Sequence, residues 1–368
     1  MSDEVRMDAE VLKDFMRAAF CAVGVPDKDA EICADVLICA DKLGIDSHGI
    51  NRCKPIYIDR IKAGIQNTQT EFEIVKETPT TATVDGHNGM GHVIAKRCME
   101  MAIKKADEYG MGMVVARNST HFGIAGYYAL MAAEAGMIGQ IGCNARPSIA
   151  PTFGVENMLG TNPLTFGMPT DEEFPFLLDC ATSVTQRGKI EYYAREGKST
   201  PAGLVIDRSG KTRTDTEGIL ADLVAGKAAL VPLGGIGEDT GGYKGYGYAT
   251  VVELLSSALQ AGNFMKSLCG MKDGQRIPIE LGHFFIAMKV EAFTELDSFK
   301  KTAGDVLRAL RASEVAPGEE RIYTAGEKEY LESLVRQEKG IPLPHGVQKD
   351  MTTLRDELGL DGFSFPWD

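Results

Sequence analysis

The spacing of apolar residues changes twice along this chain, and these changes constrain the fold more than any other feature of the sequence. From residue 8 to about residue 64, apolar side chains recur at helical spacing. Between residues 72 and 295, short runs of β type alternate with helical stretches, at 81–85, 113–116, 176–179, 204–207 and 283–290. Helical spacing returns after residue 295. The pattern therefore predicts helical ends and a mixed α and β centre.

We predict an α+β protein in which both chain ends contribute to one helical domain. A chain of 368 residues is too long for one simple core and suggests about two domains. On this prediction, residues 1–70 form the N-terminal part of the helical domain and residues 71–295 form the α+β domain. Residues 296–368 form a helical C-terminal part that packs with the N-terminal helices.

Composition and charge exclude several classes of protein. The net charge of -13 does not supply the basic face that a general nucleic-acid binder needs. No apolar run approaches the length of a membrane span, and Met1-Ser2-Asp3-Glu4 lacks the basic and apolar regions of a signal peptide. The eight cysteines are scattered without a C-x-x-C pair, as is typical of reduced thiols. We expect a cytoplasmic protein with no nucleic-acid partner and no membrane partner.

The segment Ser47-His48-Gly49-Ile50-Asn51-Arg52 combines an imidazole with a guanidinium. Ser47 is a good N-cap, so we predict a helix that begins here and runs to Gly64, with His48 in its first turn. The helix dipole would favour a neutral imidazole, which a general base requires. Arg52 would share a helix face with His48 and could bind a carboxylate. An isolated motif of this kind is more often a surface histidine near a helix cap, so companion motifs decide.

Two glycine-rich stretches are candidates for a nucleotide site. The turn at 86–91 resembles a dinucleotide-binding turn, but Ile94 stands where a small residue is needed and no acid ends a second strand about twenty residues later. We therefore expect no Rossmann site. The stretch 241–247 contains Lys244 and precedes a predicted helix at 250–261, so its backbone amides and the lysine could bind phosphate. A flexible surface loop explains this stretch equally well.

Polar residues also follow several apolar runs, where they could hydrogen-bond a substrate or a ribose. These turns are Thr120-His121-Phe122-Gly123, Leu159-Gly160-Thr161-Asn162-Pro163, Asp179-Cys180-Ala181-Thr182 and Pro317-Gly318-Glu319. Each of them alone is also an ordinary turn. His87 and His92 are spaced too loosely, and have no suitable partners, for a zinc site, so no metal is expected.

Taken together and in this order, the segments resemble the malate/L-lactate dehydrogenase family, which includes the L-sulfolactate and ureidoglycolate dehydrogenases. The resemblance runs from about residue 41 to residue 319 and also draws on Tyr243-Lys244-Gly245-Tyr246-Gly247. It implies a non-Rossmann fold, in which a mainly antiparallel sheet flanked by helices binds NAD or NADP. It also implies a homodimer, with the active site in a cleft between the cofactor domain and the helical domain.

The resemblance implies roles for individual residues. His48 matches an acid/base residue supported by Ser47, and Arg52 matches a contact to the substrate carboxylate. His121 matches a second histidine, and the resemblance leaves open which of the two is the acid/base. Thr161 and Asn162 are expected to line the substrate site. The expected cofactor contacts are Asp179, Cys180, Ala181, Lys244, Gly245, Gly318 and Glu319.

The implied reaction is reversible hydride transfer between a 2-hydroxy dicarboxylate of the L-malate type and a nicotinamide cofactor, NAD, with NADP as the alternative. A dicarboxylate favours a second cation, for which Arg146 is the candidate. Two other interpretations stay open. One is a reductase of another 2-keto acid of the lactate, sulfolactate or ureidoglycolate type, and the other is a catalytically silent binding protein with the same fold.

Overall fold

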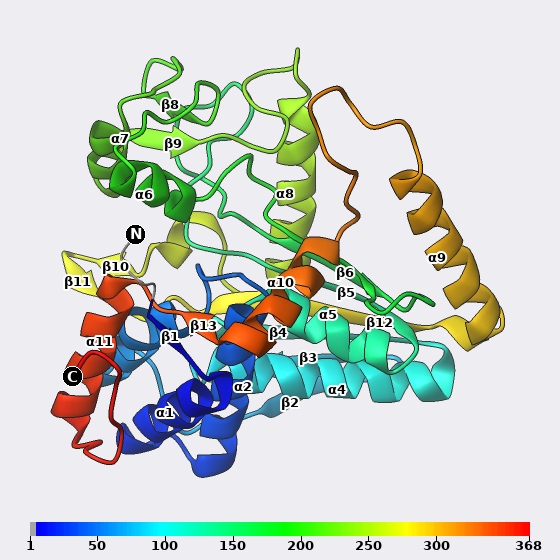
Figure 1. Cartoon of the computed structure of the whole chain (residues 1–368), viewed down its shortest axis with the longest axis horizontal. Helices are drawn as coiled ribbons and strands as arrows, with labels where there is room; N and C mark the ends of the chain where they lie inside the picture. Colours follow the sequence, from blue (N-terminus) through cyan, green and yellow to red (C-terminus); the bar gives the residue numbers. More distant parts are fainter. Residues whose placement is uncertain (1–4) are drawn as a thin grey trace.

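A seven-stranded sheet forms the centre of the computed structural model, which describes residues 5–368 (Figure 1). Residues 1–4, to which the signal-peptide expectation refers, lie outside the described residues. In spatial order the strands are β2 (Glu73–Glu77), β3 (Thr81–Asp85), β4 (Met111–Ser119), β12 (Leu281–Lys289), β5 (Met137–Cys143), β6 (Leu164–Met168) and β7 (Phe176–Cys180). Every neighbouring pair is antiparallel except β3 with β4. The predicted α+β class with a mainly antiparallel sheet is confirmed.

Helices cover both faces of this sheet. The central strand β12 shows why, because successive side chains of a strand point to opposite faces. Phe285 packs into the core formed with α4 (Gly91–Tyr109) and α5 (Ala125–Glu134). Phe284 packs on the other face with Val252 of α8 (Gly242–Ser257). Both faces of β12 are therefore buried, which fits its nearly continuous apolar sequence.

The two chain ends meet in a helical layer. It contains α1 (Ala9–Ala22), α2 (Asp27–Lys42), α10 (Glu327–Lys339) and α11 (His345–Leu358), and β1 (Arg6–Met7) pairs with β13 (Ile341–Pro342). Phe15 of α1 lies edge-on to both Phe363 and Phe365 from the C-terminal segment. The intervening helix α9 (Leu296–Arg311) lies elsewhere, at the margin of the molecule (Figure 1). Its Arg308 pairs with Asp171 and Glu172, between β6 and β7.

Residues 187–230 form a small unit whose core also includes Ile149, Leu159 and Ala249 from the neighbouring chain segments. It consists of α6 (Arg187–Arg195), β8 (Val205–Asp207), α7 (Thr216–Val224) and β9 (Ala228–Leu230), and β8 pairs with β9. The remaining short elements are η3 (Met265–Cys269), β10 (Met271–Lys272), β11 (Gln275–Arg276) and η4 (Val290–Ala292). Among the described residues, no helix combines the length and apolar character needed to cross a bilayer.

The helix predicted from Ser47 to Gly64 is wrong in form. This stretch contains a 3₁₀ turn η1 (Ile50–Arg52), a π-helical turn η2 (Cys53–Ile58) and a short α3 (Asp59–Lys62). Ser47 is not an N-cap, because its Oγ lies 2.7 Å from Nδ1 of His48. The Ile50 N–H group, at the start of η1, donates instead to the Asp41 carboxyl of α2.

The predicted start of α8 is also wrong. The helix begins at Gly242 instead of residue 250, so that the glycine-rich stretch forms its first turns. A Cβ atom at Gly245 would lie 2.1 Å from the carbonyl oxygen of Leu233. Glycine here therefore permits close packing of the helix on the preceding chain, which sequence periodicity does not reveal.

Candidate active site

His48 lies in a segment that α2 and α10 hold on both sides. Asp41, buried in α2, accepts the Ile50 N–H group through Oδ2 at 2.8 Å. Arg336 of α10 is 5% exposed, donates to the Asp41 carbonyl oxygen at 2.7 Å and pairs with the Asp46 carboxylate at 2.5 Å. These contacts fix the backbone before and after His48, which explains the irregular helical turns that follow.

The rings of His48 and His121 stack, with centroids 5.8 Å apart and planes inclined by 20°. Tyr57 Oη lies 2.5 Å from His121 Nδ1, and the Gly123 N–H group donates to the same nitrogen at 3.3 Å. A backbone N–H group can only donate, so Nδ1 of neutral His121 is the acceptor and Nε2 carries the ring proton. The structure thus brings together the two histidines that the sequence left as alternatives.

Both imidazoles are held neutral at physiological pH. Burial, followed by the nearby Arg52 cation, lowers the pKa of His48 to about 4. Burial, followed by the charge of His48, lowers the pKa of His121 well below its ordinary value. The expected neutral state therefore holds, but the helix-dipole explanation for it was wrong, because no regular α-helix begins at residue 47.

Arg52 lies close enough to the histidines for its charge to lower the pKa of both, and its terminal nitrogens have no hydrogen-bond partner among the described residues. Its Nε donates to the Ser47 carbonyl oxygen at 2.5 Å, which fixes the direction of the side chain. Within residues 5–368 no carboxylate pairs with Arg52. A guanidinium anchored in this way can present two N–H groups to a carboxylate.

Asn162 joins the polar turns to α8. Its amide donates to the Ala249 carbonyl oxygen at 3.1 Å and to Glu253 Oε2 at 2.8 Å, and its Oδ1 accepts the Ala145 N–H group at 3.2 Å. The side chain is completely buried. Both amide hydrogens are thus used within the protein, and the substrate contacts expected for Thr161 and Asn162 stay predictions.

Asp179, at the end of β7, is tied to the segment that carries His121. Its Oδ2 accepts the Gly126 N–H group at the start of α5 at 2.7 Å, and its Oδ1 accepts the Thr165 hydroxyl at 2.8 Å. Burial raises the pKa of this carboxyl. The contacts bring Cys180 and the residues after it toward the His121 turn.

The start of α8 is linked to the same region through Leu233. The Leu233 N–H group donates to the Thr182 carbonyl oxygen at 2.8 Å, and the Leu233 backbone packs against Gly245. Lys244, in the first turn of α8, is exposed and lies 5.7 Å from the centre of the Tyr243 ring. No carboxylate within the described range pairs with this lysine.

Comparison with known proteins places the chain in a family. The family model for malate/L-lactate dehydrogenase matches residues 7–352. The chain belongs to the malate/L-lactate dehydrogenase family. A malate dehydrogenase from Pyrococcus horikoshii is 41% identical over 358 residues, which cover 97% of each chain. An L-sulfolactate dehydrogenase from Methanocaldococcus jannaschii is 36% identical and covers 98% of this chain and 96% of its own.

The fold agrees with this assignment. The crystal structure of malate dehydrogenase from Entamoeba histolytica superposes with a TM-score of 0.94 at 45% identity, over 99% of this chain and 100% of that chain. Membership of the malate/L-lactate dehydrogenase family makes the chain an oxidoreductase that uses a nicotinamide cofactor. The family resemblance stated from the motifs is thereby confirmed.

The residues present fit such a cofactor. A lysine without an acidic partner in the first turn of α8, beside glycine backbone, is suited to a pyrophosphate group. Gly318 and Glu319 lie in the exposed connection between α9 and α10. In the part of the chain that is described, the Glu319 carboxylate makes no hydrogen bond or ion pair. Its predicted cofactor contact therefore stays a prediction, as do those of Asp179, Cys180 and Ala181.

Two residues beside the histidines, Tyr57 and Arg60, were not predicted from the sequence. Tyr57 is completely buried and bonds His121, and Arg60 is a half-buried cation whose charge lowers the pKa of the same imidazole. In a continuous α-helix the side chains of both residues would point in directions different from those that the π-helical turn gives them. Pro55 within the apparent helical pattern was a signal that this segment is irregular.

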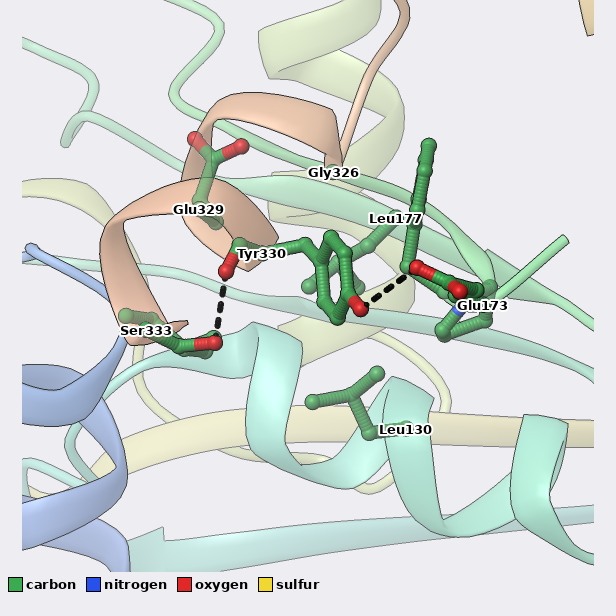
Figure 2. Close-up of a pocket in the computed structure, with 10 residues that line it drawn as sticks. Leu130, Glu173, Leu177, Gly326, Glu329, Tyr330 and Ser333 are labelled. Carbon is green, nitrogen blue, oxygen red and sulfur yellow. Dashed lines mark hydrogen bonds between the residues drawn. The ribbon is translucent and has the colours of Figure 1, made fainter. Parts of the chain in front are cut away.

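A small, mainly apolar pocket lies apart from these residues, between α5 and α10 (Figure 2). Leu43, Leu130 and Leu177 contribute to its lining. Two of its polar groups bond each other, since Tyr330 Oη donates to Glu173 at 2.9 Å. None of the predicted catalytic or cofactor residues lines this pocket, and we assign no ligand to it.

Proposed function

We propose that the chain catalyses the reversible oxidation of L-malate to oxaloacetate, with NAD as cofactor and NADP as the alternative. The stacked pair of neutral histidines beside the open end of Arg52 carries this proposal. It is supported by relatives named as malate dehydrogenases that match over nearly the whole chain. The expected substrate is a small 2-hydroxy or 2-keto dicarboxylate.

The geometry favours His48 as the acid/base. Ser47 Oγ can accept the Nδ1 proton of His48, which leaves the lone pair on Nε2 for the substrate hydroxyl proton. His121 presents an Nε2 proton and can donate a hydrogen bond to the same oxygen. Arg52 holds the carboxylate next to the reacting carbon. A nicotinamide cofactor would supply the hydride acceptor, so loss of the hydroxyl proton to His48 and of a hydride from C2 would convert the alcohol into the ketone.

Further assignments belong to this proposal. Lys244 and Gly245 bind the cofactor phosphates, and Asp179, Cys180, Ala181, Gly318 and Glu319 form its other contacts. Arg146 contributes to binding the second carboxylate. We further propose a homodimer in the cytoplasm. Exposed apolar side chains on α8 and α9, including Val251, Leu254 and Val306, support a second copy as the partner.

A panel of 2-keto acids, each assayed with NADH and with NADPH by nicotinamide absorbance, tests the activity. Oxaloacetate with NADH should give the highest kcat/KM. A higher value for pyruvate or sulfopyruvate would replace malate by a lactate-type or sulfolactate-type substrate. Absence of calorimetric binding of either cofactor would contradict the proposal and favour a silent binding protein.

The two histidines should differ in what they contribute. His48→Asn removes the proton acceptor, so we expect kcat for malate oxidation to fall about 10²- to 10⁴-fold while cofactor affinity changes little. His121→Asn keeps a hydrogen-bond donor at this position and should cost about tenfold less than His48→Asn. Steady-state kinetics, with circular dichroism to verify folding, measure both. A greater loss in the His121 variant would reverse the assignment.

A further inference from the structure

Arg60 is a half-buried cation without an acidic partner. It lies on α3, and none of the ion pairs of the described residues includes it. Burial, together with the charges of Arg146 and Arg276, lowers its pKa, whereas Tyr57 raises it. Among the described residues, no carboxylate contributes to this shift of the Arg60 pKa. A protein that gathers guanidinium groups without anions stores repulsion, which an anionic ligand relieves.

The fold explains why these cations converge. Across β12, His283 pairs with Ala116 of β4 on one side and with Cys143 of β5 on the other. Because β4 and β5 are both antiparallel to β12, they run in the same direction and end at the same edge of the sheet. His121 follows β4 and Arg146 follows β5, so both leave this edge, about 10 Å apart at the strands.

Arg276 and Arg60 approach the same edge from other elements. Strand β12 starts at this edge, because its first residue, Leu281, lies opposite Ser119 at the end of β4. Arg276, in the hairpin β10–β11, precedes Leu281 by five residues. Arg60 follows Tyr57 by three residues, about one helical turn. Because the Tyr57 hydroxyl contacts His121, this turn faces the catalytic pair.

We propose that Arg60, with Arg146 and Arg276, binds the distal anionic group of the substrate while Arg52 binds the carboxylate next to the reacting carbon. This inference rests on the proposed 2-hydroxyacid activity and names the structural basis of its substrate class. A carboxylate and a sulfonate have the same charge and accept the same hydrogen bonds, so the cluster fits either as the distal group. Arg60 is the central member because it alone of the three is half-buried.

The burial of Arg60 also gives it a larger effect than Arg146 or Arg276. A charge-assisted hydrogen bond to a partly desolvated guanidinium is stronger than one to a solvated guanidinium. Arg146 and Arg276 are exposed, so water screens their contacts. Removal of Arg60 should therefore weaken recognition of a dianionic substrate more than removal of either neighbour.

The test compares a dianionic substrate with a monoanionic one in the same variants. Arg60→Met should lower kcat/KM for L-malate about 10- to 100-fold relative to wild type, and kcat/KM for L-lactate less than about threefold. Arg60→Lys keeps the charge and should recover part of the malate activity. Arg195→Met, at an exposed arginine of α6, is the matched control and should change neither value.

The outcomes separate this inference from the proposed function. If wild type turns over neither malate nor lactate, the proposed function fails. If wild type is active but Arg60→Met lowers malate and lactate turnover by the same factor, only the distal-anion assignment is overturned. Calorimetric titration of succinate and propionate into wild type and Arg60→Met gives a second readout, in which only succinate should bind more weakly to the variant. L-Sulfolactate in the kinetic panel distinguishes a sulfonate from a carboxylate as the preferred distal group.

Discussion

At the scale of single residues, burial sets the protonation states around the active site. His92 is completely buried, and neither of its ring nitrogens has a hydrogen-bond partner among the described residues. The centre of its ring lies 4.5 Å from the centre of the Tyr57 ring. Burial lowers its pKa to about 3. Because Tyr57 bonds His121, the neutral His92 ring packs against the residue that holds the catalytic pair.

His92 should make the protein less stable in acid. Its folded-state pKa lies below its unfolded value of 6.5, so the unfolded chain binds the extra proton between these pH values. Stability is therefore lost as pH falls from about 6.5 toward 3. His92→Leu removes this loss, and we expect its free energy of unfolding relative to wild type to be about 2 kcal/mol higher at pH 5 than at pH 8.

Urea denaturation of both proteins at the two pH values measures this difference. Asp41, whose pKa burial raises to about 8, loses its contribution as pH rises, but it is present in both proteins and cancels. His345→Leu, at an exposed position at the start of α11, is the control and should follow the wild-type profile. If the free energy of unfolding of His92→Leu differs from that of wild type by the same amount at pH 5 and pH 8, His92 does not change its protonation on unfolding.

At the scale of elements, α2 and α10 determine where the catalytic segment lies. Gly49 is packed so closely on Asp41 that a Cβ atom would lie 1.8 Å from Oδ1. Gly49→Ala must therefore displace the segment or the buried carboxyl, and either change moves His48. We expect kcat to fall at least about tenfold and stability to fall by about 1–3 kcal/mol, as for other steric clashes in a core.

Kinetics and urea denaturation of Gly49→Ala test this role of the close packing. Gly346→Ala is the matched control, because it lies on α11 with nothing within 4 Å of the new Cβ atom. It should leave kcat unchanged. Wild-type kcat in Gly49→Ala would mean that the segment tolerates displacement and that α2 does not fix the position of His48.

Elements and motifs differ in how far the sequence predicts them. The strand predicted at 81–85 matches β3, because alternating apolar residues and flanking turns are local signals. The stacking of His48 on His121 has no local signal, since it depends on the packing of α2 against the sheet domain. Arg336 likewise holds the catalytic segment from 290 residues beyond Asp46. The sequence thus predicted site members within each motif, whereas the contacts between distant elements required the structure.

At the scale of the whole molecule, α9 presents an apolar surface that the chain itself does not cover. Val306 is 54% exposed and Leu310 is 53% exposed, four residues apart on one face. The opposite side of α9 is held against the protein by Arg308, which pairs with Asp171, and by the buried Gly304. An amphipathic helix anchored in this way and exposing its apolar residues is suited to pack against a second copy.

The proposed homodimer should therefore depend on α9. The double change Val306→Glu and Leu310→Glu puts two charges on the apolar face of α9. Because buried unpaired charges in an interface cost several kcal/mol, it should raise the dimer dissociation constant at least about 100-fold. Sedimentation velocity should give twice the chain mass for wild type and one chain mass for the variant. Val224→Glu, at a 63% exposed position on α7, is the control and should stay dimeric. A variant that remains a dimer would place the interface elsewhere, for example on the exposed face of α8, and a monomeric wild type would exclude the dimer altogether.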